Sequence, residues 1–202
     1  MSTARASLRT SAVAVRAMVV LTLVLGVGYT LLISLIGLAL PAQANGSLLR
    51  DAEGQVVGSS LIGQSFTDAD GEALPQYFQS RPSAAGDGYD AAASSGSNLG
   101  PNNADLVAAV EERRTAIADR EGVAVSDVPP DAVTASASGL DPHISPAYAE
   151  LQVARVAAER GLSDAEVRDL VAENTAGRDL GFLGEPRVNV VELNAALDGL
   201  AR

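Results

Sequence analysis

The sequence predicts one transmembrane helix near the N-terminus, followed by a single mixed α+β domain. Three observations lead to this fold class. Residues 17–40 form an uncharged apolar run, several segments after residue 100 carry helix-capping signals, and short β-branched stretches lie between them. Helices interrupted by brief strands are typical of an α+β arrangement around one core. We therefore divide the chain into a tail at 1–16, a transmembrane helix at 17–40 and a soluble domain at 41–202.

The apolar run reads AMVVLTLVLGVGYTLLISLIGLAL and contains no charged residue. As a helix it would be roughly 36 Å long, which exceeds a hydrocarbon core of about 30 Å. A cleaved signal peptide is the alternative, because Ala42-Gln43-Ala44 resembles a cleavage site. Signal-peptide apolar regions usually have about 7–15 residues, so the length favours an uncleaved membrane anchor.

Charge is distributed unevenly along the chain. Arg5, Arg9 and Arg16 are the only charged residues before residue 41. The remaining 11 arginines stand against all 25 acidic residues, so the domain has a net charge of −14. Because basic residues near a transmembrane helix stay in the cytoplasm, we expect the N-terminus inside and the domain outside the cell. An acidic domain is not expected to bind a phosphate backbone, which argues against nucleic acid as a partner.

Four small or hydroxyl-bearing residues recur at every fourth position of the apolar run: Thr22, Gly26, Thr30 and Ser34. This spacing places them along one ridge of a helix. A ridge of small residues lets a second helix approach closely and offers hydroxyl groups for hydrogen bonds across the contact. The ridge therefore predicts a helix-packing surface within the membrane.

The first part of the outer domain has few regular signals. Residues 55–66 mix β-branched residues with glycine, which predicts a short strand or two. Residues 67–103 are rich in Asp, Gly, Ser, Pro and Asn, and they show no clear periodicity. A loop-rich region of this length is unusual in a compact domain unless it is functional or mobile.

Helix signals are clearer after residue 100. A helix is expected from the cap candidates at Asn102 and Asn103 to Gly122, and another from Ser145 to Gly161. Residues 163–166 form a capping box, and the Asn189 and Glu192 pair repeats that spacing before the last helix. Residues 133–138 alternate as in a strand or extended segment.

The inventory of side chains excludes several chemistries. The chain has no Cys, so it has neither disulfides nor thiolate ligands nor a cysteine nucleophile. It also has no Lys, which excludes a Walker A lysine and a Schiff-base lysine. With one histidine and no cysteine, a zinc site is not supported. We assign no metal-binding residue.

His143 is the single histidine, within the segment Asp141-Pro142-His143-Ile144. A Ser–His–Asp triad with Ser136 or Ser138 and Asp141 can be drawn, but there is no G-x-S-x-G motif to support it. We favour a role for Asp141 and His143 in fixing a turn or contacting another subunit, together with Arg81, which lies between aromatic and proline residues. A membrane-tethered serine hydrolase and a freestanding exported binding protein remain alternatives. We assign no catalytic residue.

Four segments carry a resemblance to a known family. They are YFQSRPSA at 77–84, ASSGSNLGP at 93–101, VTASASGLDPHISP at 133–146 and LGEPRVNV at 183–190. These segments closely resemble the C subunit of the Kdp potassium-transporting ATPase, and the likeness extends over nearly the whole chain. The third segment is the most specific.

The resemblance implies an accessory subunit of a high-affinity potassium importer in the bacterial cytoplasmic membrane. It implies two protein partners in the lipid bilayer, a channel-like subunit that translocates potassium and a P-type subunit that hydrolyses ATP. The family is described as a catalytic chaperone that raises the ATP affinity of the hydrolysing subunit, with an ATP-binding description and no tightly bound cofactor. Because ATP is cytoplasmic and the charge pattern places the domain outside, we assign no residue to ATP.

Overall fold

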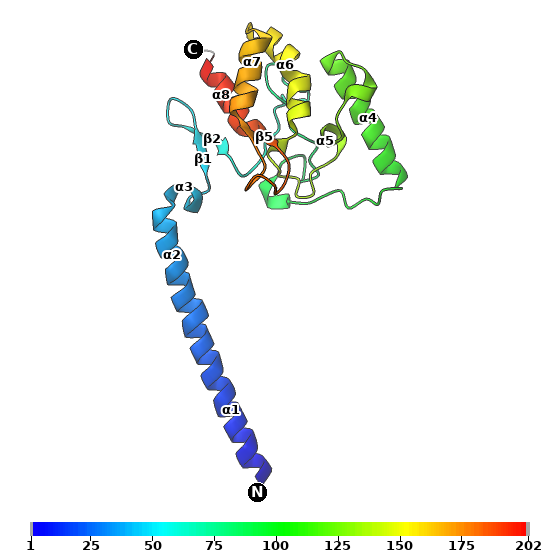
Figure 1. The fold of residues 1–202 in the computed structure, drawn as a ribbon. Helices are drawn as coiled ribbons and strands as arrows, with labels where there is room; N and C mark the ends of the chain where they lie inside the picture. The colour runs from blue at the N-terminus through cyan, green and yellow to red at the C-terminus, as the bar shows by residue number, and fades with distance from the viewer. Residues whose placement is uncertain (1, 201–202) are drawn as a thin grey trace. The chain divides into compact units, whose positions relative to one another are not determined.

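The computed structural model describes residues 2–200 and divides into two compact units, Met1–Ser47 and Leu48–Arg202 (Figure 1). Met1, at the start of the predicted tail, and Ala201 and Arg202, at the end of the predicted domain, lie outside the described residues. Each unit is described by itself.

The first unit is helical almost throughout. Its elements are α1 (Ser2–Leu21), the π-helix η1 (Thr22–Tyr29), α2 (Thr30–Ala39) and the short α3 (Pro41–Ala44). The stretch Leu8–Ala39 is long and apolar enough to cross a membrane, by length and composition alone. Helix therefore begins well before the predicted start at residue 17, because the tail is rich in alanine, which favours helix. Leu40 interrupts the helix at φ −125°.

The π-helix contains Thr22 and Gly26 of the small-residue ridge, and Thr30 and Ser34 follow in α2. The Thr30 hydroxyl donates to the Gly26 carbonyl at 2.8 Å, and the Ser34 hydroxyl donates to the Thr30 carbonyl at 2.9 Å. Both hydroxyl groups therefore donate to backbone carbonyls of their own helix. The sequence predicts hydrogen bonds from these hydroxyls to a second helix. Packing of a second helix against this ridge remains a prediction.

The second unit has the mixed helix and strand content that the sequence predicts. Its strands are β1 (Leu48–Arg50), β2 (Val56–Ser59), β3 (His143–Ile144), β4 (Thr175–Ala176) and β5 (Arg187–Asn189). Its helices are η2 (Ala91–Ala93), α4 (Ala104–Glu121), η3 (Val125–Asp127), α5 (Pro130–Val133), α6 (Pro146–Arg160), α7 (Asp164–Glu173) and α8 (Val190–Leu200). All strand pairs are antiparallel, in two small sheets ordered β1-β2 and β3-β5-β4.

The predicted helix caps are confirmed at atomic detail. Asn103 accepts hydrogen bonds from the first turn of α4, and Gly122 ends that helix at φ 67°. Ser145 caps α6, and Ser163 caps α7 in a complete capping box. Asn189 accepts from the first turn of α8 in the same way. Side-chain oxygens thus satisfy amide groups that a helix start leaves unpaired.

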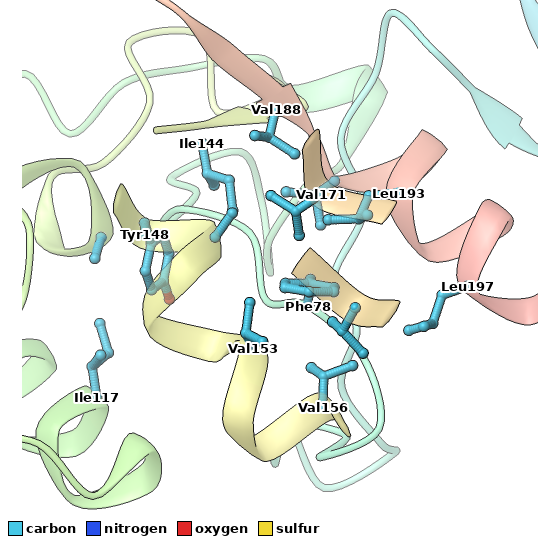
Figure 2. Close-up of a cluster of buried hydrophobic side chains, with 14 of the residues drawn as sticks. Phe78, Ile117, Ile144, Tyr148, Val153, Val156, Val171, Val188, Leu193 and Leu197 are labelled. Carbon is cyan, nitrogen blue, oxygen red and sulfur yellow. The ribbon is translucent and has the colours of Figure 1, made fainter. Parts of the chain in front are cut away.

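The core forms where α6, α7 and α8 pack together (Figure 2). Its largest fully buried apolar side chains are Tyr148, Val153 and Val156 of α6, Val167 of α7, Val188 of β5, Val190, Leu193 and Leu197 of α8, Val133 of α5 and Phe78. Phe78 comes from the loop-rich region, so part of that region belongs to the core.

The sequence predicts a strand or an extended segment at 133–138; no strand forms there, and Thr134 has the extended backbone conformation. Val133 ends α5, and the Thr134 hydroxyl donates to the Pro130 carbonyl at 2.7 Å, which completes that helical turn. The following residues bend toward Gly139, whose φ of +70° only glycine adopts readily. The extended segment lies later, at β3.

Candidate functional site

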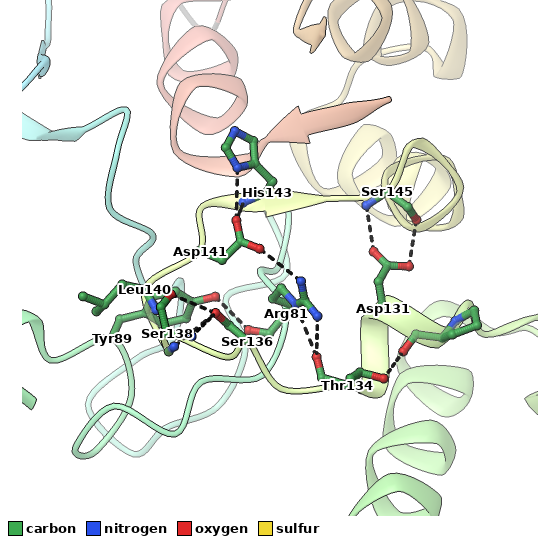
Figure 3. A network of polar contacts seen from close by, with 12 residues as sticks. Arg81, Tyr89, Asp131, Thr134, Ser136, Ser138, Leu140, Asp141, His143 and Ser145 are labelled. Carbon is green, nitrogen blue, oxygen red and sulfur yellow. Dashed lines mark hydrogen bonds and ion pairs between the residues drawn. The ribbon is translucent and has the colours of Figure 1, made fainter. Parts of the chain in front are cut away.

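Arg81, Asp141 and His143 form one cluster in the second unit, although Arg81 and Asp141 are 60 positions apart (Figure 3). Arg81 donates to Asp141 Oδ2 at 3.0 Å, and His143 Nδ1 lies 3.0 Å from Asp141 Oδ1. Asp141 Oδ1 also accepts from the His143 backbone N–H at 3.0 Å. The carboxylate of Asp141 therefore joins the long loop to the start of β3.

The surroundings of Asp141 favour its charged form. Burial raises the pKa of this carboxyl group, but the hydrogen bonds from His143 and the charges of His143 and Arg81 outweigh burial. The pKa of Asp141 is therefore below its usual value of 3.8. The carboxylate is ionised at neutral pH and holds Arg81 by both charge and hydrogen bonding.

Backbone contacts fix Arg81 from two more directions. Its guanidinium group donates to the Thr134 carbonyl through Nε and Nη2, at 3.3 and 3.2 Å. The Arg81 carbonyl accepts the Tyr89 hydroxyl at 2.7 Å. Burial raises the pKa of Tyr89 to about 12, so this phenol remains a donor at any physiological pH.

Gly63 packs closely against Tyr89 and the backbone of Asp141. Its N–H donates to the Leu140 carbonyl at 2.9 Å. A β-carbon at this position would lie 2.4 Å from Cε1 of Tyr89 and 2.9 Å from the Asp141 carbonyl oxygen. Neither distance is possible for a real contact, so the close approach requires glycine.

Two buried amide side chains hold the loop that carries Arg81. Gln152 of α6 accepts from the Gln79 N–H at 2.7 Å and donates to the Gln79 carbonyl at 3.2 Å. Asn194 of α8 accepts from the Phe78 N–H and donates to the Phe78 carbonyl, both at 2.9 Å. We call these two residues the amide clamp. They pair the loop backbone as a neighbouring strand would, so the loop is ordered without regular structure.

The Ser–His–Asp alternative lacks a nucleophile beside the histidine. The hydroxyls of Ser136 and Ser138 lie 3.1 Å from each other and accept from the backbone N–H groups of Gly139 and Leu140. In the part of the chain that the structure describes, neither hydroxyl bonds to His143. Asp141 and His143, the acid and base of this alternative, are adjacent. The two serines instead stabilise the turn that leads to Leu140.

The cluster is partly exposed. Arg81, Asp141 and His143 are 22%, 30% and 35% exposed, so each presents part of its surface to solvent. Within residues 2–200, no group of three or more His, Asp or Glu side chains is arranged to hold a metal ion. A fixed pair of charges with an exposed imidazole edge suits contact with another protein surface.

The clamp residues and Tyr89 were missed by sequence reasoning. Gln152 and Asn194 are polar residues at inward-facing helix positions beside Tyr148 and Leu193, and that conflict with the apolar pattern was the available signal. No local signal points to Tyr89, whose role depends on the fold.

The segments that carry the resemblance meet around this cluster. Arg81 of the first segment binds Asp141 of the third, and the Ser94 hydroxyl of the second donates to the Ser138 carbonyl of the third. The third and fourth segments pair as β3 and β5, with His143 opposite Asn189.

Comparison with known proteins shows the family of the chain. The family model described as "K+-transporting ATPase, c chain" matches residues 11–199. The chain belongs to this K+-transporting ATPase c-chain family. A c-chain relative from Kineococcus radiotolerans, named potassium-transporting ATPase KdpC subunit, is 58% identical over 91% of this chain and 90% of its own. Relatives with the same name from Koribacter versatilis and Methylococcus capsulatus are 53% and 54% identical, covering 90% and 91% of this chain and 90% and 94% of their own.

Proposed function

We propose that this chain is a non-catalytic accessory subunit of a potassium-importing ATPase, anchored by one transmembrane helix with its domain outside the cell. The observation that carries the proposal is the family match over residues 11–199, with relatives named as subunits of a potassium-transporting ATPase. The partly exposed charge cluster supports a role in contacting other subunits. The ATP-hydrolysing and potassium-translocating functions then belong to partner chains.

The same proposal limits the role of ATP. If the domain lies outside, it cannot touch cytoplasmic nucleotide, so any effect on ATP affinity acts through the partner subunits. The three N-terminal arginines are the residues that support this orientation. The family's chaperone role is thus proposed here as an indirect effect on the hydrolysing subunit.

Co-purification tests the subunit assignment. The tagged chain is extracted from its native membrane in mild detergent, and the proteins that accompany it are identified by mass. We expect a P-type ATPase and a channel-like membrane protein in fixed ratio to the chain. Recovery of the chain alone would overturn the assignment and favour a freestanding exported binding protein.

Thiol labelling tests the orientation. The chain is free of cysteine, so Ser95→Cys, in an exposed loop, provides one reactive site. In intact cells, a membrane-impermeant thiol reagent should label this variant. Labelling only after lysis would place the domain in the cytoplasm and restore direct ATP contact as a possibility.

The serine hydrolase alternative is tested at His143. We expect His143→Ala to lower the yield of assembled complex while the complexes that form keep their turnover. Normal assembly with no turnover would support a catalytic histidine.

A further inference from the structure

A short hairpin between β4 and β5 exposes three large apolar side chains. We call residues 178–185 the apolar hairpin. Within it Leu180 is 83% exposed, Phe182 68% and Leu183 49%. Single exposed apolar residues are common, but three within four positions concentrate apolar surface that is unfavourable in water.

The hairpin is built to keep these side chains outward. The backbone groups of Asp179 and Leu183 exchange two hydrogen bonds of 2.9 Å, and Gly181 donates to the Arg178 carbonyl at 3.1 Å. Leu180 has φ +53°, a conformation that a residue with a β-carbon rarely adopts. The fold therefore accepts an unfavourable backbone conformation at the most exposed of these three apolar residues. Strain of this kind is typical of functional positions.

The hairpin belongs to the same sheet as the charge cluster. The strands β4 and β5 flank it, and β5 pairs with β3, where His143 lies opposite Asn189. Its position is thus fixed by the sheet that also carries the exposed imidazole.

Charge indicates what covers the hairpin. Arg178 pairs with Glu185 within the hairpin, and Arg187 of β5 pairs with Asp179, so both cations at the hairpin base are already paired with acids. The domain carries a net charge of −14, which repels an anionic membrane surface and also a second copy of the chain. A protein partner with an apolar recess and a basic rim satisfies both the side chains and the charge.

We infer that the apolar hairpin inserts into an apolar recess on the outer face of another subunit of the potassium pump. This inference rests on the proposed function, because it takes the partner from the subunit assignment. Insertion would bury Leu180 and Phe182, the two most exposed side chains of the hairpin, at the centre of the contact.

A pair of double variants tests the insertion. Leu180→Asn with Phe182→Ser removes the apolar side chains, and asparagine tolerates the left-handed backbone at residue 180. Leu61→Asn with Val125→Ser is the matched control, since these residues are 62% and 45% exposed elsewhere. Each full-length chain is expressed with the other subunits, and the co-purified partners are quantified per tagged chain. We expect a loss on the order of tenfold for the hairpin variant, and wild-type recovery for the control.

Two further measurements distinguish misfolding of the hairpin variant from loss of its contact with a partner. Thermal unfolding of the hairpin variant in detergent should occur at or above the wild-type temperature, which shows that lost recovery is not misfolding. A photoreactive p-benzoylphenylalanine in place of Phe182 should crosslink to another pump subunit. Crosslinking to a second copy or only to lipid, or full recovery with the hairpin variant, would overturn the inference alone. A wild-type chain that recovers no partner would overturn the proposed function as well.

Discussion

At the scale of single residues, Asp141 is the centre of the candidate site. Its two carboxylate oxygens bind Arg81 and His143 separately, at 3.0 Å each. Arg81 and His143 do not compete for the same oxygen, so the cluster needs no rearrangement to satisfy all three groups. Removing the charge of Asp141 therefore weakens two contacts at once.

The lowered pKa of Asp141 predicts a pH-dependent contribution to stability. Because the folded-state pKa lies below the usual 3.8, the stabilisation is present above that value and is lost as pH falls through the folded-state pKa. Urea unfolding of the full chain in detergent would be followed from pH 7 to pH 2.5, for wild type and Asp141→Asn. We expect the wild type to be more stable at neutral pH and the difference to shrink below about pH 4. A difference that stays constant over this range would show that Asp141 does not gain stability from its charge.

Gly63 provides a second prediction at this scale. Gly63→Ala forces Tyr89 or the Asp141 backbone to move, since its β-carbon would lie 2.4 and 2.9 Å from them. We expect the free energy of unfolding to fall by about 1–3 kcal/mol. Gly100→Ala is the control, because no atom lies within 4 Å of a β-carbon there. Equal stability of the two variants would mean that the packing around Gly63 adjusts freely.

At the scale of elements, the amide clamp explains how a long loop becomes part of the core. Gln152 is fully buried, and Asn194 is 1% exposed. Each pairs both backbone groups of one loop residue, so Phe78 enters the core without leaving polar groups unsatisfied. Helices α6 and α8 thereby determine where Arg81 is presented.

Replacing Gln152 with leucine should be costly. Leucine has a similar size but leaves the N–H and carbonyl of Gln79 buried without partners, at about 1–3 kcal/mol for each group. We therefore expect Gln152→Leu to lower the free energy of unfolding by about 2–4 kcal/mol, measured by urea denaturation. Gln55→Leu, at an exposed position, should stay within about 0.5 kcal/mol of wild type. An equally small effect at Gln152 would mean that water replaces the clamp.

Contacts between residues close in sequence could be predicted, whereas contacts between residues far apart in sequence could not. The caps at Asn103, Ser145 and Ser163 were predictable because donor and acceptor lie within three residues of each other. The amide clamp was not, because Gln152 is 73 positions from Gln79 and Asn194 is 116 from Phe78. The members of the charge cluster were singled out from sequence, but that Arg81 joins Asp141 and His143 required the fold. The prediction of a strand at 133–138 failed because alternation alone does not distinguish a strand from serine-rich turns.

The helical unit gives a prediction about packing in the membrane. A β-carbon on Gly26 would have only Thr22 Cγ2 nearby within its own helix, at 3.7 Å. Gly26→Leu should therefore leave the helix itself intact and push away a neighbouring helix. We expect a loss of about 1–3 kcal/mol in association, or roughly five- to 150-fold, seen as co-purified partner per chain.

Leu25→Phe, on a neighbouring face of the same helix, is the matched variant and should have little effect if that face meets lipid. Both chains would be compared at equal expression. Wild-type recovery with Gly26→Leu would show that the ridge is not an interface and that assembly depends on the second unit.

At the scale of the whole molecule, the two units divide the work that we propose. The first supplies a helix that can cross the membrane, and the second supplies an acidic domain with a fixed charge cluster and an apolar hairpin. Neither unit contains the lysine or cysteine chemistry of common catalytic sites, since the sequence has neither residue. We propose that this chain acts by influencing other subunits.

The ATP dependence of the assembled pump tests that central claim most directly. Potassium-stimulated ATP hydrolysis would be measured over a range of ATP concentrations for the purified chain, for the pump purified with it, and for the pump purified from cells that lack it. The account predicts no hydrolysis by the chain alone, and a higher ATP concentration for half-maximal activity when the chain is missing. Hydrolysis by the chain alone, or an unchanged ATP dependence in a pump without it, would contradict the account.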